Sequence, residues 1–279
     1  MNQTTPSGRG DGEPARAAGR VPTLTVQVVN FNTVAYLRDC LRSVTAALAA
    51  TPVSSRIALL DNGSGDDLGD IETEFAETVD VHVLDHNRGF GAGHNALAER
   101  NTSPLICLVN PDVVATQPDV LVRLLDVLQD PGVAVAGPQL RTATGEPQRF
   151  DHGELRGLRA RIALGAGHAH WRPRSQRTEV AWVSGAFLLV RRTAFDAAGG
   201  FDEGFFLYKE EEDLCLRIRQ AGGRVLYCPD AEARHVGSVV AHRDPAHLDA
   251  SVTRFQAKHH AGHRRRLYDA LYRHVTRRI

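Results

Sequence analysis

The sequence predicts an α/β fold in which helices flank a Rossmann-like, mostly parallel central sheet. Short runs of β-branched and other apolar residues alternate with stretches whose apolar residues recur at helical spacing, an order typical of βαβ units. The runs are rich enough in apolar residues to be strands buried on both faces. With 279 residues, 42% of them hydrophobic, the chain is long enough to form a substantial core.

The regular alternation lies in the first half of the chain. Residues 1 to 20 precede it and are rich in Gly, Arg, Ser, Pro and Ala, so we predict a disordered tail that cannot offset its ordering entropy. Buried strands are predicted at Leu24–Val29, Ile57–Leu60, Val81–Leu84 and Leu105–Val109, and helices at Tyr36–Ala50, Ala92–Arg100 and Gln117–Gln129.

The second half is less regular. Residues 141 to 178 mix Arg, Gly and His, and we expect an excursion over the functional site. Further elements are predicted as a strand or strand pair at Val180–Val190, a helix at Glu210–Gln220, a strand at Arg224–Cys228 and a long basic helix from Pro245 nearly to the end. Since no Pro-rich linker divides the core, we expect one domain, residues 21–240, and a basic C-terminal helical extension, residues 241–279.

Composition excludes several classes of protein. Lys and Arg together number 33, as do Asp and Glu, and this balance argues against a nucleic-acid-binding protein. No apolar stretch reaches the ~20 residues that span a bilayer, and the N-terminus lacks the apolar region of a secretory signal. The four cysteines form no C-x-x-C pair. We therefore expect a cytoplasmic protein with reduced cysteines.

Polar or Gly-rich residues follow each of the four strands predicted in the first half. Any one of these segments taken singly is better explained as an ordinary turn. However, the carboxyl ends of parallel strands meet at one edge of a sheet, where ligands bind in open α/β folds. All four together therefore favour a ligand site, formed by Asn30–Asn32, Asp61–Ser64, Asn87–Asn95 and Asn110–Asp112.

The Gly-rich segment allows two interpretations. Residues 91–96 match the G-x-G-x-x-A dinucleotide pattern, and Asp112 follows the next strand at roughly the expected spacing, which would suit a nicotinamide-dependent oxidoreductase. The match lies in the third βα unit rather than the first, which weakens that interpretation. With Arg88, the glycines instead favour close approach of backbone N–H groups to a diphosphate at a helix N-terminus.

Two acidic features suggest chemistry. Asp112 follows a buried strand, where it can hold a divalent cation on a nucleotide diphosphate or simply cap a turn. Residues 210–213 place four acids at the start of a predicted helix, where the helix dipole favours acids in any case. Mutual repulsion among them can raise the pKa of one carboxyl, which would suit a general base.

Together these segments resemble the family 2 glycosyltransferases of the GT-A fold, and most closely their bacterial rhamnosyltransferase-like branch. The resemblance extends from Thr23 to Ser238 and rests on residues 28–33, 60–66, 87–95, 110–112 and, most specifically, 184–235. It implies an inverting enzyme that moves a sugar from a nucleoside-diphosphate donor, of the dTDP-rhamnose or UDP-sugar type. The acceptor would be a hydroxyl of a glycan, a lipid-linked or a small-molecule acceptor.

The resemblance also implies roles for individual residues. The donor would be bound by Asn30, Asn32, Asp61, Arg88, Gly89, Gly93 and Asn95. Mg²⁺ or Mn²⁺ would be held by Asp112, at the last acid of the D-x-D metal motif, and by His235. The general base would be Glu211, with Glu210 and Asp213 as alternatives. The family usually has Asp at the position of Glu211 and an aromatic residue at that of Lys209.

These departures leave open a catalytically degenerate protein that binds a nucleotide sugar without transferring it. Further partners are suggested by the C-terminal residues 251–279, which hold eight Lys or Arg and one acid. A basic amphipathic helix there would suit peripheral contact with an anionic membrane, at its inner face for a cytoplasmic protein. Packing on the domain or contact in a homodimer would explain the same pattern.

Overall fold

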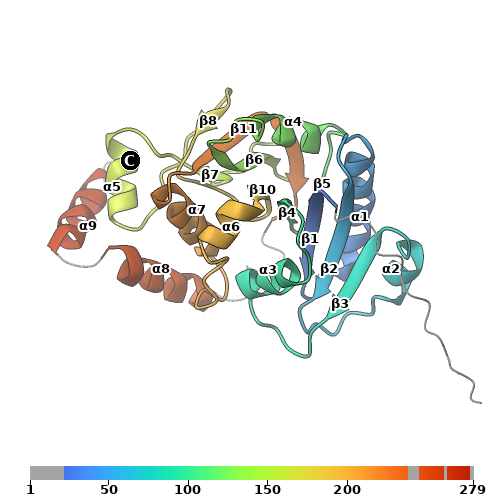
Figure 1. Ribbon diagram of the computed structural model, residues 1–279. Coiled ribbons are helices and arrows are strands. Elements are labelled where there is room, and N and C mark those ends of the chain that lie inside the picture. Colours follow the sequence, from blue (N-terminus) through green and yellow to red (C-terminus); the bar gives the residue numbers. More distant parts are fainter. Residues whose placement is uncertain (1–21, 238–244, 261–262, 277–279) are drawn as a thin grey trace, which may run out of the picture.

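The computed structural model describes residues 22–237, 245–260 and 263–276, and it has the predicted α/β architecture (Figure 1). Within this part of the chain, a nine-stranded sheet has the order β3-β2-β1-β4-β10-β6-β11-β5, and β8 pairs with β11. Most of its paired residues lie in parallel ladders, between β3, β2, β1 and β4 and between β6 and β11. A small second sheet joins β7 and β9.

The first half follows the predicted alternation closely. Its elements are β1 (Leu24–Asn30), α1 (Val34–Ala49), β2 (Ser55–Asp61), α2 (Gly69–Glu74), β3 (Val79–Val83), α3 (Phe90–Glu99) and β4 (Leu105–Val109). All four predicted strands and the first two predicted helices are confirmed, with ends within two residues of those expected. Only α2 was not predicted, because six residues carry too little helical periodicity.

The second half contains the antiparallel part of the sheet. Its elements are β5 (Val113–Val114), α4 (Val120–Val127), β6 (Val133–Arg141), β7 (His152–Gly153), α5 (Leu158–Gly165), β8 (Thr178–Glu179), β9 (Trp182–Val183), β10 (Phe187–Arg191), α6 (Arg192–Ala197), α7 (Glu210–Gln220) and β11 (Arg224–His235). At 180–190, where a strand or strand pair is predicted, the structure has two strands that lie in different sheets, because β9 pairs with β7 and β10 pairs with β4 and β6. Strand β11 runs seven residues beyond its predicted end, because a register shift between Cys228 and Glu232 accommodates Pro229 and pairing resumes after it.

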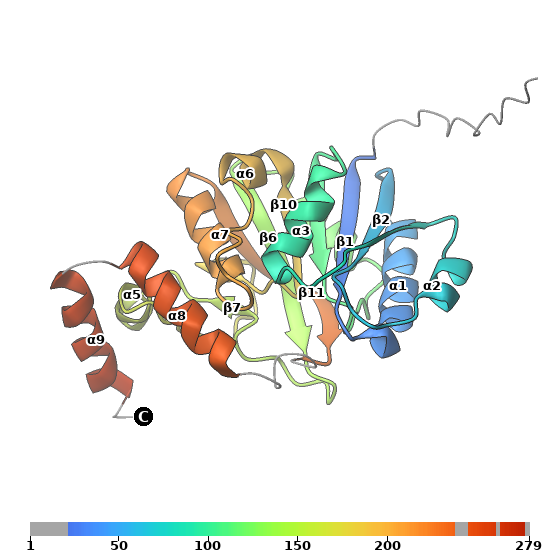
Figure 2. The same cartoon turned by 90° about the horizontal axis from the view of Figure 1, so that it is seen from below.

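Helices cover both faces of the sheet, as expected for buried parallel strands. On β1, Val26 and Val28 pack in the core cluster that includes Leu37 of α1 and residues of α2 and α4. Val29 faces the other way and packs with Leu97 of α3. Figure 2 shows α3, α6 and α7 together on this second face. The alternation of side chains along each strand therefore separates the two cores.

The predicted long C-terminal helix is wrong in one respect, because it is two helices, α8 (Pro245–His259) and α9 (His263–Thr276). The intervening sequence contains Gly262, a residue unfavourable within a helix. Both helices lie at the end of the molecule remote from β3 (Figure 1). Helix α9 contacts α5, and its Tyr272 stacks on His168, which follows α5, with 4.3 Å between ring centroids.

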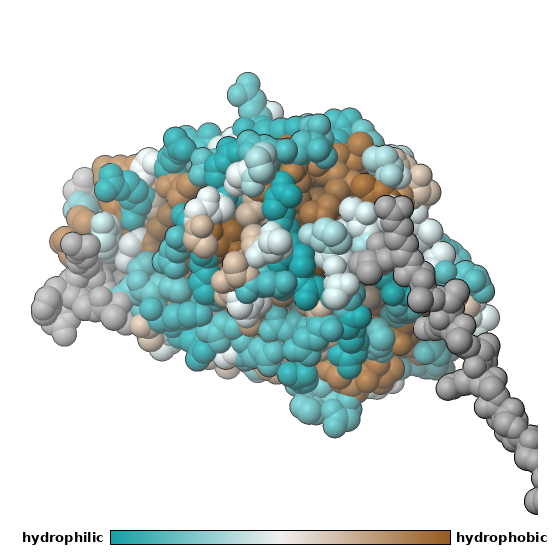
Figure 3. Space-filling model, in the orientation of Figure 1, coloured by the Kyte–Doolittle hydropathy of each residue, from teal (hydrophilic) through white to brown (hydrophobic). Residues whose placement is uncertain are grey.

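Several expectations concern residues outside the described ranges, including the disordered tail and the last residues of the basic extension. On the face shown in Figure 3, hydrophilic residues cover most of the area, and apolar residues form separate patches. Among the residues that the structure describes, no helix combines the length and the apolar character needed to cross a membrane.

Candidate active site

A cavity of about 490 Å³ lies at the carboxyl ends of β1, β2 and β4, the edge where the sequence predicts a ligand site. Its walls come from segments scattered between Val29 and His247. Six of the predicted site residues line it: Asn32, Gly89, Asp112, Glu210, Glu211 and His235. The structure therefore brings donor-binding, metal-binding and base candidates to one place.

Asp112 and His235 form one corner of the cavity. Strand β11 pairs with β5 antiparallel and sets His235 opposite Val113, the residue after Asp112. The Nε2 atom of His235 consequently lies 3.3 Å from Oδ1 of Asp112. The other carboxylate oxygen of Asp112 accepts a hydrogen bond from the backbone N–H of Gly237 at 3.1 Å. Pairing of two strands distant in sequence thus explains why these residues meet.

This corner fits a divalent cation. Nε2 of His235 is buried without a hydrogen-bond partner, and it faces a carboxylate oxygen. In the parts of the chain described, no cluster of three or more His, Cys, Asp or Glu could hold a metal on its own. Two protein ligands are nonetheless sufficient where the phosphates of a nucleotide and water supply the others. The carboxylate and imidazole ligands therefore suit Mg²⁺ or Mn²⁺ bound together with a diphosphate.

Glu211 presents a carboxylate to the same cavity from the first turn of α7. It packs beside Gly185 in the turn between β9 and β10, where an added Cβ would lie 3.5 Å from the Cβ of Glu211. Its Oε2 atom is buried and has no hydrogen-bond partner. Burial, and then the charge of Glu212, raise the pKa of Glu211 to about 7. A carboxylate with this pKa is suited to accept a proton near neutral pH.

Glu210 lies beside Glu211 and also lines the cavity. Its side chain is more deeply buried, and its Oε2 atom likewise has no partner. Burial and the charge of Glu211 raise the pKa of Glu210 well above its ordinary value. Since Glu211 is the more accessible of the two, it is the better placed to meet an acceptor hydroxyl.

The chain enters α7 through two strained residues. Tyr208 and Lys209 both have left-handed backbone angles, with φ values of 70° and 69°. Each costs roughly 1–2 kcal/mol for a residue with a side chain, a cost tolerated mainly at functional sites. Nζ of Lys209 lies 2.8 Å from Oε1 of Glu212 and 5.5 Å from the ring centroid of Phe255 on α8. Neither Lys209 nor Glu212 lines the cavity, so the unusual lysine packs beside it.

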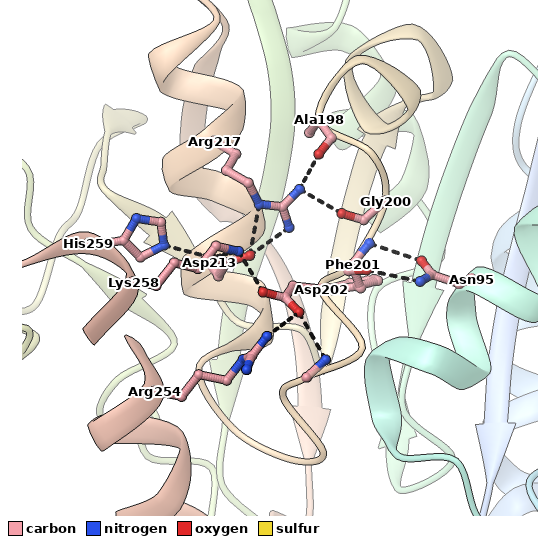
Figure 4. Close-up of polar contacts among 11 residues, drawn as sticks. Asn95, Ala198, Gly200, Phe201, Asp202, Asp213, Arg217, Arg254, Lys258 and His259 are labelled. Atoms are coloured by element: carbon pink, nitrogen blue, oxygen red, sulfur yellow. Dashed lines mark hydrogen bonds and ion pairs between the residues drawn. The ribbon is translucent and has the colours of Figure 1, made fainter. Parts of the chain in front are cut away.

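Asp213 does not line the cavity; it joins α7 to α8 (Figure 4). Its carboxylate is fully buried and accepts hydrogen bonds from His259 at 2.6 Å and Arg217 at 2.8 Å, while Nζ of Lys258 lies 2.7 Å away. Burial alone would raise the pKa of Asp213, but the hydrogen bonds from His259 and Lys258 and the charge of Arg217 lower it. This environment indicates a structural role.

The segment 198–209 contributes residues 206–208 to the cavity wall, and its earlier part is held from two sides (Figure 4). On one side, Asn95 of α3 donates to the carbonyl of Phe201 at 3.0 Å and accepts from its N–H at 2.9 Å. On the other, Asp202 pairs with Arg254 and Lys258 of α8 at 2.8 and 2.7 Å. Asn95 therefore holds this wall in place, although the sequence suggested that it binds the donor.

The cavity is not lined by the remaining predicted donor residues, Asn30, Asp61, Arg88 and Gly93. The Asn30 amide donates to Oδ1 of Asp61 at 2.9 Å, and Asp61 also accepts from Ser64, so the pair shapes two loops. Arg88 pairs with Glu203 at 3.1 Å. Gly93 allows α3 to approach the sheet, because a Cβ there would lie 2.9 Å from Val29. Close packing thus accounts for a glycine that the dinucleotide pattern would assign to a cofactor.

Other residues line the cavity to which the sequence assigns no individual role. Asn62 follows a predicted strand, and its amide donates to the carbonyl of Gly89 at 3.1 Å, which fixes the turn before α3. Gln148 and His247 come from the excursion and from α8, and no local pattern marks either of them. His247 stacks with Phe206, with 4.8 Å between ring centroids. Such residues can be identified only once the fold has brought them to the cavity.

Comparison with known proteins agrees with this geometry. The sequence pattern of the family described as "Glycosyltransferase like family 2" matches residues 22–259. The N-acetylglucosaminyl-diphospho-decaprenol L-rhamnosyltransferase of Mycobacterium tuberculosis H37Rv is 31% identical over 271 residues, covering 86% of this chain and 85% of the relative. Rhamnosyltransferase WbbL of Escherichia coli K12 is 41% identical over 81 residues, covering 29% of each chain.

Two solved structures share the fold. The mannosyltransferase PcManGT from Pyrobaculum calidifontis, in complex with GDP-Man and Mn²⁺, superposes with a TM-score of 0.58 at 15% identity, covering 80% of this chain and 59% of that one. The TarS protein of S. aureus superposes with a TM-score of 0.59 at 14% identity, covering 85% and 39%. At such low identity the likeness concerns the architecture alone.

Proposed function

This chain belongs to glycosyltransferase family 2, and we propose that it transfers a sugar, with inversion, from a nucleoside diphosphate to an acceptor hydroxyl. It is a rhamnosyltransferase-like glycosyltransferase with the GT-A fold. One observation carries the finer proposal. The unpartnered carboxylate of Glu211, whose pKa is raised, lines the same cavity as Asp112 and His235, which lie next to each other. A degenerate binding protein would not need the carboxylate of raised pKa. An oxidoreductase would explain neither that carboxylate nor the carboxylate–imidazole pair.

The donor would occupy the side of the cavity formed by the ends of β1 and β2. Asn32, Thr33 and Asn62 line this side with polar groups, and Gly89 also lines the cavity. The diphosphate would extend toward Asp112 and His235. We propose a dTDP-rhamnose or UDP-sugar donor, in line with the rhamnosyltransferases among the relatives.

Asp112 and His235 would hold the divalent cation, Mg²⁺ or Mn²⁺. The cation, when bound, supplies positive charge that stabilises the negative charge developing on the leaving diphosphate. The contribution of the chain is to keep the two ligands adjacent through the β5–β11 pairing. The backbone N–H of Gly237 further orients the carboxylate of Asp112.

Glu211 would act as the general base. Its carboxylate takes the proton of the acceptor hydroxyl as that oxygen bonds to the anomeric carbon of the donor sugar. The bond from the anomeric carbon to the diphosphate breaks in the same step, and the nucleoside diphosphate leaves with its electron pair. Attack on the face opposite the leaving group inverts the anomeric centre, so no covalent intermediate with the enzyme is required.

Transfer should depend on pH through Glu211. Because the basic form is the deprotonated one and the pKa is about 7, kcat/KM should fall about tenfold for each pH unit below that value and level off above it. A pH–rate profile measured with saturating Mn²⁺ tests this. An acid limb centred near pH 4.5, the ordinary value for glutamate, would show that no raised carboxyl controls the reaction.

The acceptor is proposed to be a glycan or lipid-linked hydroxyl. A relative that shares most of its length with this chain is named for a diphospho-decaprenol substrate. Helix α9 would provide peripheral contact with an anionic membrane, because Leu267 and Leu271 are exposed on it. Co-sedimentation with anionic vesicles should be lost in Leu267→Glu/Leu271→Glu. Equal sedimentation of the variant and the wild type would remove α9 from this role.

The proposed function is tested by a thermal-shift screen of nucleotide sugars with and without Mn²⁺ or Mg²⁺. We expect a dTDP or UDP sugar to raise Tm, and more so with the cation. Steady release of nucleoside diphosphate upon adding an acceptor would then distinguish a transferase from a binding protein. Stabilisation by dinucleotides but by no nucleotide sugar would contradict the proposal.

A further inference from the structure

The two ring nitrogens of His235 have different environments. Nδ1 lies 2.9 Å from the side-chain oxygen of Gln148, within hydrogen-bonding distance. Nε2 lies 3.3 Å from Oδ1 of Asp112 and has no hydrogen-bond partner, although it is buried. One nitrogen is therefore occupied by a side chain from the excursion, and the other faces the position proposed for the cation.

The amide of Gln148 determines which nitrogen of His235 carries the hydrogen. An amide oxygen only accepts, so Nδ1 must donate and Nε2 is left with a free lone pair. Were the amide N–H₂ group to face the ring instead, Nδ1 would accept and the hydrogen would move to Nε2. A protonated Nε2 cannot bind a metal ion.

The backbone around Gln148 is held in place beside β6. Its backbone N–H donates to the carbonyl of Leu140 on β6 at 2.8 Å, after a tight loop in which Thr142 donates to Glu146 at 2.8 Å. Three residues later, the carboxylate of Asp151 accepts from the Leu140 N–H at 3.3 Å and from the Tyr227 hydroxyl at 2.9 Å. Because β6 pairs with β11, these contacts fix Gln148 beside the strand that ends in His235.

We propose that Gln148 is a positioning residue that keeps His235 in the Nδ1–H tautomer, with Nε2 ready to bind the cation. The proposal rests on the metal role proposed above for Asp112 and His235. Partners of this kind, which bond to the far nitrogen of a metal-binding histidine, typically change metal affinity by about 10–100-fold when they are removed. Gln148 thus acts on the reaction through His235 rather than by touching the reacting atoms.

The tautomer can be measured without any metal. Nitrogen-15 NMR of the ring nitrogens in the metal-free protein should show the Nδ1–H form for His235 in the wild type. In Gln148→Leu, which has similar volume but no acceptor, the Nε2–H form should become populated. A wild-type His235 in the Nε2–H form, or an unchanged tautomer in Gln148→Leu, overturns the proposal whether or not a metal binds.

The consequence for the metal is measured by calorimetric titration of Mn²⁺ in the presence of dTDP. Gln148→Leu should weaken Mn²⁺ binding by about 10–100-fold, and Gln148→Glu, which restores an oxygen acceptor, should recover most of the loss. Binding of dTDP without Mn²⁺ should be unchanged.

Two outcomes contradict the proposal. One is wild-type Mn²⁺ affinity in Gln148→Leu. The other is an equal loss of metal-free dTDP binding, which would indicate direct contact between Gln148 and the nucleotide. If the wild type bound no Mn²⁺, the proposed function would fail, and the tautomer would still decide the role of Gln148.

Discussion

Replacing Glu211 with Gln is expected to lower the rate of sugar transfer by about 10²–10⁴-fold, the usual contribution of a general base. The amide keeps the size of the side chain but cannot take a proton from the acceptor hydroxyl. Donor binding should stay near the wild-type level, because the proposed donor and metal residues lie on other segments. The rate of nucleoside diphosphate release at saturating donor and acceptor, together with the donor Kd, checks both parts.

Glu212→Gln provides the matched control. Glu212 lies on the same turn of α7, but it pairs with Lys209 and does not line the cavity. Its loss should change the transfer rate at pH 8 by no more than about threefold, since it makes no proposed contact with substrate. Near wild-type turnover in Glu211→Gln would remove Glu211 from the role, and a matching loss in Glu210→Gln would assign the base to Glu210.

Replacing Asp213 with Ala should cause the largest loss of stability. The change leaves His259, Arg217 and Lys258 without the buried carboxylate that they share. Breaking a buried ion pair by removing one partner typically costs about 3–5 kcal/mol, which for a chain of this size lowers Tm on the order of 10 °C. Because the pKa of Asp213 is lowered by folding, its stabilisation is present at pH 7 and is lost only as pH falls below about 4.

Asp202→Asn is the matched control for Asp213→Ala. It distinguishes loss of the buried carboxylate of Asp213 from loss of any ion pair with α8. Asp202 also pairs with Lys258 and Arg254, but the side chains of these cations are partly exposed, at 31% and 45%, so its removal should cost about 1 kcal/mol or less. Thermal unfolding at pH 7 distinguishes the two variants. Equal Tm values for Asp213→Ala and the wild type would show that the buried cluster contributes nothing to stability. A fully folded Asp213→Ala with no transfer would support the catalytic alternative.

The secondary structure was predictable where the local pattern of apolar residues reflects burial in the final fold. Strands β1, β2 and β4 are mostly buried, so their apolar runs stand out. Strand β6 carries Gly137 and Pro138, which interrupt such a run, and it was not predicted. The direction of β10, antiparallel to β4 and β6, depends on long-range pairing that no local pattern encodes.

The candidate site shows the same division. Polar residues after strands indicated the correct edge of the sheet, since that depends on chain direction alone. Which of them reach the cavity was less predictable, because Asn95 and Asp213 have side chains suited to binding but contact Phe201 and α8 instead. The meeting of Asp112 and His235 depends on the β5–β11 register, and only the family resemblance anticipated it.

The central claim is that a donor, a cation and the Glu211 carboxylate meet in one cavity. Titration of a dTDP or UDP sugar with and without Mn²⁺, in the wild type, Asp112→Asn and Glu211→Gln, tests it most directly. Mn²⁺ should tighten donor binding in the wild type and in Glu211→Gln, but not in Asp112→Asn. Equal enhancement by Mn²⁺ in Asp112→Asn, or none in the wild type, would contradict the claim.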